Sequence, residues 1–293
     1  MRLLIIILIS TQAYFLFGQG LPNTNVYALS LKANETKVLL DDVTLLTGFN
    51  PEGYNNQPHF IDDTNLLITS DYESQGLTDI LELDTRLQRI TRITHTEESE
   101  YSPVVMSSGF DFSVVRQELD DSQPVPQVLW SYPLDRSTEG SRVIPDISNI
   151  GYYVWVTKDQ LALFIVGETP SLILYDTRHH TSTRIASNVG RCLKTDNKGM
   201  IYYVQKATSG DDIRGYDIYL GRSKRIAPMI AGQQDFEILT NGHLIAGDGA
   251  LLKSYIPNVS TDWALIKDLT STGIKEISRI AASRNKVAIV TSD

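Results

Sequence analysis

The sequence predicts an all-β protein: a six-bladed β-propeller of four-stranded antiparallel blades, closed by N- and C-terminal strands that share one blade. Three observations lead to this prediction. A unit with a period of 41 to 50 residues recurs along the chain. Apolar runs alternate with turn residues, and the two ends of the chain each carry about half of a unit.

The closing strand of the unit gives the most regular period. An arginine followed by isoleucine or valine recurs at spacings of 50, 42 and 41 residues, as Arg92-Ile93, Arg142-Val143, Arg184-Ile185 and Arg225-Ile226. Two strands that end in aspartate, at Asp84 and Asp176, are 92 residues apart, or two periods. Pro58 and Pro103, in the segments that open two successive units, are 45 residues apart. Periods of this size are typical of four-stranded propeller blades.

The first segment of the chain, residues 1–20, differs from the repeats. Met1-Arg2 supplies a positive end, residues 3–9 form an apolar run, and Gly18 and Gly20 are small residues suited to cleavage. This pattern is typical of a signal peptide and predicts export, to the periplasm or as a secreted protein. The alternative is a membrane anchor, but a spanning helix needs about 20 apolar residues. We therefore expect no stable membrane insertion after cleavage.

Residues 21–293 are predicted to form one propeller domain. Strands at residues 26–31 and 37–40 make half a blade, and strands at residues 277–282 and 286–291 make the other half. Pairing these halves would seal sheet edges that are otherwise exposed. Five complete blades are expected between them, with inner strands in apolar runs such as residues 162–166 and 201–204; their ranges are 54–94, 95–146, 147–187, 188–230 and 231–272. No mature segment shows helical periodicity.

Composition agrees with a packed domain and excludes one class of partner. Hydrophobic residues make up 42% of the 293 positions, which is enough for a substantial core. The formal net charge is −9, whereas nucleic-acid binding proteins usually present a basic surface. We expect no nucleic-acid partner. The single cysteine, Cys192, cannot form an intrachain disulfide and is expected to be buried and inert.

The first full unit resembles the repeat of TolB-type propellers, a family of WD-like repeats. The resemblance is carried by Asn56-Gln57-Pro58-His59-Phe60-Ile61-Asp62-Asp63, then by residues 66–70, 78–84 and 89–91. It extends to Glu100-Tyr101-Ser102-Pro103 and to Asp217-Ile218-Tyr219, and it weakens in the last two blades. It implies a six-bladed ring, export and a binding role, without the additional N-terminal domain of TolB itself.

Two functions of different class fit the sequence. No Gly-x-Ser-x-Gly, Walker, His-Glu-x-x-His or paired-cysteine motif occurs, which favours a noncatalytic exported propeller. Such a propeller would recognise a protein, a peptide or a cell-envelope component through its loop face, without a cofactor. The alternative is a calcium-dependent hydrolase similar to lactonase and esterase propellers, with Glu100, Asn56 and Asn188 near the axis.

The candidate ligand-binding residues lie where blades begin and are expected near the central opening. They are Tyr54, Asn56, Gln57, His59, Glu98, Glu100, Tyr101 and Arg191. An arginine near the axis would suit an anionic ligand, and Glu98 and Glu100 a cation or basic peptide. The alternatives are a solvated acidic loop, an ordinary strand side chain for His59, and blade-to-blade packing for Trp130, Trp155 and Trp263.

Overall fold

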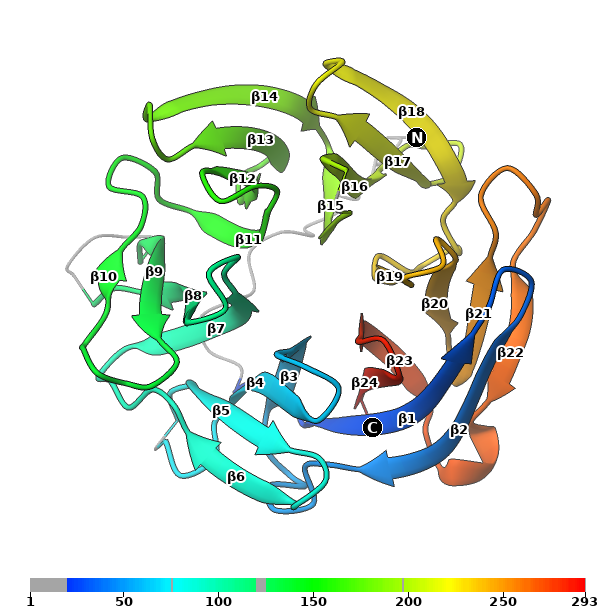
Figure 1. Ribbon diagram of the computed structural model, residues 1–293, viewed down its shortest axis with the longest axis horizontal. Helices are drawn as coiled ribbons and strands as arrows, with labels where there is room; N and C mark the ends of the chain where they lie inside the picture. The colour runs from blue at the N-terminus through cyan, green and yellow to red at the C-terminus, as the bar shows by residue number, and fades with distance from the viewer. Residues whose placement is uncertain (1–19, 75, 120–124, 197, 293) are drawn as a thin grey trace, which may run out of the picture.

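The computed structural model describes residues 20–292 except Gln75, residues 120–124 and Asn197. Six four-stranded antiparallel sheets form a ring around a central axis (Figure 1), which confirms the predicted six-bladed propeller. The one helical element among these residues is the short 3-10 turn η1 (Thr270–Thr272). Within the same ranges, no helix has the length and apolar character needed to cross a bilayer. The predicted signal peptide, residues 1–20, lies outside the described residues except for Gly20.

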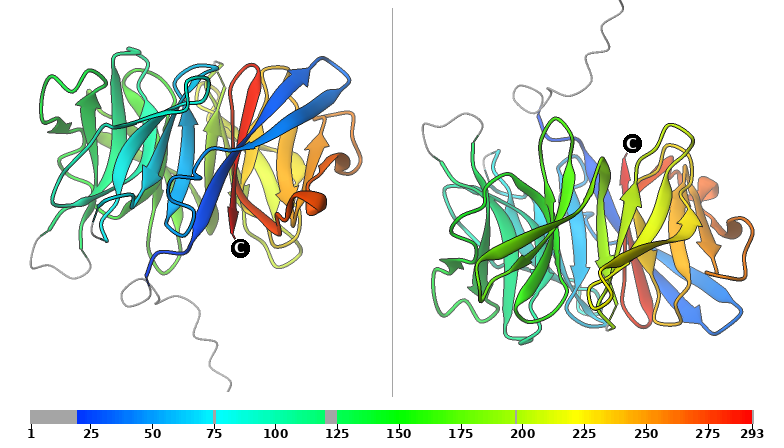
Figure 2. Two further views of the ribbon diagram at one scale, coloured as in Figure 1. Left: turned by 90° about the horizontal axis from the view of Figure 1, so that it is seen from below. Right: turned by 90° about the horizontal axis from the view of Figure 1, so that it is seen from above.

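The two ends of the chain share the closing blade. From the axis outward it contains β23 (Glu276–Ala282), β24 (Lys286–Ser292), β1 (Thr24–Ala33) and β2 (Val38–Leu45). Strands β1 and β24 pair in register from Thr24 opposite Ser292 to Ser30 opposite Lys286. Figure 2 shows this seam from the side, where β1 and β24 lie next to each other. The predicted closure by terminal strands is confirmed.

Five complete blades follow, and each runs from the axis to the rim (Figure 1). Blade 1 contains β3 (Asn55–Phe60), β4 (Asn65–Ser70), β5 (Asp79–Asp84) and β6 (Arg89–Arg92). Blade 2 contains β7 (Ser99–Val105), β8 (Asp111–Gln117), β9 (Gln127–Pro133) and β10 (Ser141–Arg142). Blade 3 contains β11 (Ile150–Trp155), β12 (Gln160–Ile165), β13 (Ser171–Asp176) and β14 (Thr181–Ser187). Blade 4 contains β15 (Val189–Thr195), β16 (Met200–Gln205), β17 (Asp212–Asp217) and β18 (Arg222–Pro228). Blade 5 contains β19 (Phe236–Ile238), β20 (Leu244–Asp248), β21 (Leu251–Tyr255) and β22 (Ala264–Asp268).

One detail of the predicted blades is wrong. The apolar runs at residues 162–166 and 201–204, expected at the axis, belong largely to the second strands β12 and β16. The innermost strands β11 and β15 precede them and contain both buried and partly exposed residues. The second strand is covered on both faces by neighbouring blades and is therefore almost continuously apolar. The innermost strand borders the axis and can carry polar residues.

The recurring aspartates mark the same turn in three blades. The Asp84 Oδ1 atom accepts hydrogen bonds from the backbone N–H groups two and three residues later, at 2.9 and 2.8 Å. Asp176 and Asp217 accept the corresponding pairs of bonds at 2.9 to 3.0 Å. Aspartate favours this turn because its carboxylate satisfies backbone donors that the strand no longer pairs. The sequence period therefore has a structural cause at the end of the third strand.

The apolar core is divided among the blade interfaces. Six clusters of buried apolar side chains occur among the described residues, one at each contact between neighbouring blades. The cluster between blades 2 and 3, for example, joins Val115 and Leu129 to Tyr153 and Leu161. Because apolar burial is placed between the blades, the axis is left to other side chains. These axial side chains form the candidate site.

Candidate functional site

The innermost strands of all six blades surround a cavity of about 370 Å³, which we call the axial channel. Its walls consist of residues 57–60 of β3, 102–104 of β7, 152–154 of β11, 191–195 of β15, Asp235 with residues 237–238 at β19, and 279–282 of β23. These segments come mainly from the C-terminal halves of the strands. The volume falls in the range of about 300–1,000 Å³ that is usual for ligand pockets.

Backbone bulges direct several of these side chains. The pairing of the first and second strands shifts register in blades 1 to 4 and in the closing blade. In blades 1 and 2 the register shift occurs around Gln57 and Ser102, which have positive φ angles of 53° and 54°. The Gln57 Oε1 atom accepts a hydrogen bond of 2.8 Å from the Ser102 backbone N–H. Bulges of this kind bend a strand and change the direction of its side chains.

The axial channel has two chemically different halves. Its charged half comes from β15, β19 and β23, three innermost strands that follow one another around the ring. This half contains Arg191, Lys194, Asp235, Glu237 and Arg279. The uncharged half comes from β3, β7 and β11 and presents prolines, aromatic rings, a glutamine and a histidine. A ligand in this channel would therefore meet ionic groups on one side only.

Two ion pairs organise the charged half. The Lys194 Nζ atom lies 2.6 Å from the Glu237 Oε2 atom and joins β15 to β19. Burial alone would lower the pKa of Lys194, but the Glu237 carboxylate raises it above its ordinary value. The Asp235 Oδ1 atom accepts a hydrogen bond of 2.8 Å from the Ile280 backbone N–H. Its Oδ2 atom lies 3.8 Å from the Arg279 Nη1 atom.

A hydrogen bond spans the axial channel from one side to the other. The Arg279 Nη2 atom donates to the Tyr152 hydroxyl at 2.8 Å, and the guanidinium lies 5.0 Å from the centroid of the same ring. Strands β23 and β11 belong to opposite blades of the ring (Figure 1). We call this contact the strap. Burial would raise the pKa of Tyr152, but Arg279 and Arg191 together lower it, so this phenol lies within a positive field.

Two further residues of the channel walls have shifted pKa values. Burial and the neighbouring Lys194 charge lower the pKa of His59 to about 4, so its imidazole is uncharged at neutral pH. Burial raises the pKa of Cys192 to about 12. The thiol donates a hydrogen bond of 3.3 Å to the Phe236 carbonyl. Since the thiolate is the reactive form, Cys192 is a poor nucleophile at neutral pH.

The structure brings several predicted site residues together near the axis. Gln57, His59 and Arg191 line the axial channel. Tyr54 is buried and within electrostatic range of Tyr101 and of both channel arginines. Asn56 is also buried, but its side chain accepts a hydrogen bond from the adjacent Gln57 backbone and is not part of the channel wall. Whether any of these residues contacts a ligand stays a prediction.

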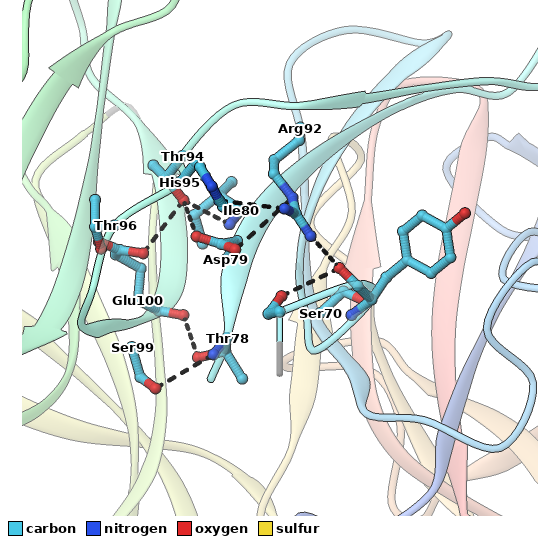
Figure 3. A network of polar contacts seen from close by, with 12 residues as sticks. Ser70, Thr78, Asp79, Ile80, Arg92, Thr94, His95, Thr96, Ser99 and Glu100 are labelled. Carbon is cyan, nitrogen blue, oxygen red and sulfur yellow. Dashed lines mark hydrogen bonds and ion pairs between the residues drawn. The ribbon is translucent and has the colours of Figure 1, made fainter. Parts of the chain in front are cut away.

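Glu98 and Glu100 do not belong to this group, and the expectation that Glu100 faces the central opening is wrong. Glu100 is fully buried at the junction of blades 1 and 2 (Figure 3). Its carboxylate accepts hydrogen bonds from Thr96 at 2.5 Å and from Thr94 at 3.3 Å. Arg116 pairs with Glu98 and lies 4.0 Å from Glu100. The cause is the alternation of β7, which turns Glu100 toward blade 1 and Tyr101 toward the apolar cluster between blades 2 and 3, so neither residue lines the axial channel.

A second cavity, of about 790 Å³, lies between blades 1 and 2 where β10 has only two residues. We call it the flank groove; its walls include residues 93–98, Arg116, Trp130, Tyr132 and residues 138–140. The Arg116 guanidinium stacks on the Trp130 ring, 4.3 Å from its centroid. The indole N–H groups of Trp155 and Trp263 instead donate to the neighbouring blade, at 2.9 and 2.8 Å. Two of the three tryptophans therefore link blades, as the packing alternative proposed.

The three residues of the calcium alternative have different surroundings. Glu100 is enclosed between Thr96 and Tyr132, whereas Asn188 is exposed and donates to the Lys206 carbonyl in its own blade. Asn56 bonds locally to the following residue. Elsewhere in the described ranges, no group of three or more His, Cys, Asp or Glu side chains could hold a metal ion. These surroundings differ too much for the three residues to share one ion.

Sequence reasoning missed most wall residues of the axial channel, including all those that form its ion pairs and the strap: Tyr152, Lys194, Asp235, Glu237 and Arg279. The sequence does contain a marker for some channel positions. The Pro58 and Pro103 period marks the bulges of blades 1 and 2, and channel residues lie at or just after these bulges. In blades 3 to 5 and in the closing blade this proline is missing, so the sequence gives no marker for the corresponding positions.

Comparison with solved structures supports the same architecture. The fold matches TolB from Acinetobacter baumannii with a TM-score of 0.58 and 15% identity, over 92% of this chain and 65% of that one. It matches a putative TolB from Agrobacterium tumefaciens with a TM-score of 0.65 and 10% identity, over 94% and 99% of the two chains. A chain from a nidogen/laminin complex matches with a TM-score of 0.61 and 11% identity, over 82% and 93%.

These similarities establish the fold, and the expected TolB-like propeller is confirmed at that level. The chain spans less than two thirds of the TolB protein from Acinetobacter, at 65% of its length. No model of a known protein family matches the sequence, and no curated protein matches it either. The function must therefore be argued from the residues of the axial channel.

Proposed function

We propose that this chain is a noncatalytic binding propeller that holds a segment of a protein or peptide partner in its axial channel. The proposal is carried by one observation: all six blades contribute side chains to a single cavity with one charged and one uncharged half. Recognition sites typically combine apolar and aromatic walls with a few oriented polar groups. A peptide segment can present both kinds of group at once, and a cell-envelope component with an exposed polypeptide would do the same.

The chemistry of the channel supports binding over turnover. A nucleophilic mechanism needs an activated nucleophile and a base within hydrogen-bond reach. The Cys192 thiol has a pKa raised to about 12 and bonds a backbone carbonyl. His59 is uncharged at neutral pH but has its pKa lowered to about 4, so it is a weak base. Lys194 is held by Glu237 and stays protonated. Each group is thus better suited to contact a ligand than to activate one.

Export to the periplasm or to the exterior belongs to the same proposal and rests on the sequence of residues 1–20. Expression of the full chain should yield a mature protein in the exported fraction that begins near residue 21. N-terminal sequencing would show this directly. A mature protein that still begins at Met1 would contradict this part of the proposal.

The binding role is tested by blocking the axial channel. Residues 21–293 would be screened against an immobilised random peptide library, and the best peptide would be measured by fluorescence anisotropy. Thr195 is a half-buried wall residue, and the matched control Thr181 is exposed on the outer strand β14. Thr195→Trp should weaken binding at least about tenfold, which corresponds to about 1.4 kcal/mol. Thr181→Trp should leave it unchanged.

Two results would contradict the proposal. The first is a peptide whose affinity is the same for the unmodified protein and for Thr195→Trp. The second is hydrolysis of a small ester or lactone that Thr195→Trp abolishes, because the channel would then be an active site. A calcium requirement for that hydrolysis, removed by a chelator, would favour the metal-dependent alternative.

A further inference from the structure

The charges of the axial channel do not cancel. Three basic residues, Arg191, Lys194 and Arg279, face two acidic ones, Asp235 and Glu237. The uncharged His59 adds nothing at neutral pH. The channel therefore carries one surplus positive charge within a chain whose net charge is −9. Such a local reversal of sign attracts anions to the site.

The surplus charge resides on Arg191. Lys194 has Glu237 as its partner, and Arg279 has Asp235. Among the described residues no carboxylate lies within 4.0 Å of the Arg191 guanidinium. The Arg191 Nη2 atom donates a hydrogen bond of 3.3 Å to the Ser278 carbonyl. That bond directs the guanidinium from β15 toward β23, the strand that carries Arg279.

Both channel arginines have an N–H donor that no protein group satisfies. The Nε atoms of Arg191 and Arg279 are buried and lack a hydrogen-bond partner in the described part of the chain. A buried donor without an acceptor is unfavourable, and most buried donors in proteins are satisfied. An arginine presents its donors in a planar fork that matches two oxygens of one oxyanion. The two guanidinium groups therefore offer more donor capacity than the protein itself uses.

Tyr152 lines the channel beside these arginines, and Tyr54 lies within their electrostatic range. Tyr152 receives the strap bond from Arg279 and lies in the field of Arg191. Burial keeps the pKa of Tyr54 well above its ordinary value, so its hydroxyl stays protonated and can donate. The charges of Arg279 and Arg191 both act on Tyr54. The guanidinium groups of Arg191 and Arg279 and the phenol of Tyr152 thus share one cavity, from blade 4, the closing blade and blade 3.

We infer that Arg191 and Arg279 form an oxyanion subsite that holds a carboxylate of the bound segment, from an acidic side chain or a chain end. The inference rests on the proposed function and names the group by which the partner is recognised. A carboxylate carries one negative charge and matches the single surplus charge of the channel. A phosphate group carries about 1.5 to 2 negative charges near neutral pH and matches it less well.

The test compares three pools of hexapeptides with random sequence. One pool contains a single glutamate and has both ends capped, one is neutral with a free C-terminal carboxylate, and one is neutral with both ends capped. Inorganic phosphate forms a fourth arm.

At least one carboxylate pool should bind at least about tenfold more tightly than the capped neutral pool. Arg191→Gln should abolish this difference. Arg184→Gln should leave it intact, because Arg184 is an exposed arginine on β14 whose side chain has no hydrogen bond or ion pair in the described structure.

A measurement on the unmodified protein covers the case in which Arg191→Gln does not fold. Sodium acetate should displace a bound carboxylate peptide, whereas acetamide at the same concentration and matched ionic strength should not. Equal binding of all three pools, lost in Thr195→Trp, would overturn the subsite and leave the proposed function standing. Displacement by phosphate at lower concentration than acetate would overturn the carboxylate assignment in favour of a polyanion. Absence of binding by every pool would overturn the subsite and the proposed function together.

Discussion

The buried carboxyl of Glu100 provides a quantitative test of how blades 1 and 2 are joined. Burial raises the pKa of Glu100 from 4.5 to about 7, although hydrogen bonds from Thr96 and Thr94 and the charge of Arg116 act in the opposite direction. The charge of Asp79 adds to the increase. One pKa unit corresponds to about 1.4 kcal/mol, so ionising Glu100 costs about 3 kcal/mol more in the folded protein than in the unfolded chain.

The sign of the pH dependence follows from proton binding. Below about pH 4.5 the carboxyl is protonated in the folded and unfolded chains alike. Between about pH 4.5 and 7 only the folded chain keeps the proton, so stability is lost as the pH rises through this window. Integration of the two titrations from pH 5 to pH 8 gives a loss of about 2.5 kcal/mol from this one group.

Glu100→Gln removes the titration and keeps a neutral side chain of nearly the same shape. The substitution should therefore be more favourable at pH 8 than at pH 5, by about 2.5 kcal/mol in the free energy of unfolding. If the amide also changes the packing, a resulting change in unfolding free energy that is the same at both pH values cancels in this difference. Other groups that titrate in the same window contribute equally to both proteins and cancel.

The measurement is urea unfolding of both proteins at pH 5 and pH 8, followed by tryptophan fluorescence. Glu168→Gln is the control, because Glu168 is exposed in the loop that precedes β13 and should show no such difference. A pH-dependent difference below about 1 kcal/mol for Glu100→Gln would refute the assignment of Glu100 as a carboxyl protonated in the fold near neutral pH.

Three further predictions concern the seam, a blade interface and the cysteine. Asp63→Ala removes two hydrogen bonds from Asn285, of 3.1 and 2.8 Å, between blade 1 and the closing blade. It should lower the unfolding free energy by about 1 kcal/mol in urea, whereas Glu168→Ala, at an exposed carboxylate with no side-chain hydrogen bond among the described residues, should not. Trp155→Phe loses an indole bond to a serine of the neighbouring blade and should also cost about 1 kcal/mol; an unchanged urea midpoint would contradict this. Cys192 should resist a thiol reagent at pH 8 until the protein is unfolded, and rapid labelling of the folded protein would contradict its burial.

The sequence was sufficient for the architecture because the repeating features have local causes. Asp84 and Asp176 recur because each caps the same turn through hydrogen bonds to residues two and three positions later. Pro58 and Pro103 each follow a bulge residue of positive φ, so the same local backbone shape recurs in blades 1 and 2. Features that depend on neighbours in sequence can be recognised in sequence. They fix the period, and the period fixes the number of blades.

The axial channel was less predictable because its contacts join residues that are distant in the chain. Arg191 meets a carbonyl 87 residues later, and Arg279 meets Tyr152 across 127 residues. No local pattern reports which innermost strand lies opposite which. Side-chain direction was a second obstacle: Glu100 and Tyr101 are adjacent in β7 and lie on opposite sides of the strand. Both side chains therefore face neighbouring blades, and the prediction that they lie at the central opening is wrong for this reason.

Under the proposed function, the division of the channel into halves limits the kind of ligand that can bind and how that ligand must lie. Six similar blades could have presented the same side chain six times, which would suit a symmetric ligand. Instead β15 and β23 contribute arginines and a lysine, while β3 and β7 contribute Pro58, Pro103 and the uncharged His59. An unbranched segment with an acidic group on one side and apolar atoms on the other can satisfy both halves in one orientation only. If the segment were rotated about the axis, its carboxylate would face proline and its apolar atoms would face guanidinium. The carboxylate and the guanidinium would then both be unpaired in a buried site. Under the proposed function, the blade repeat thus supplies the scaffold, and the departures from that repeat at the axis supply the specificity.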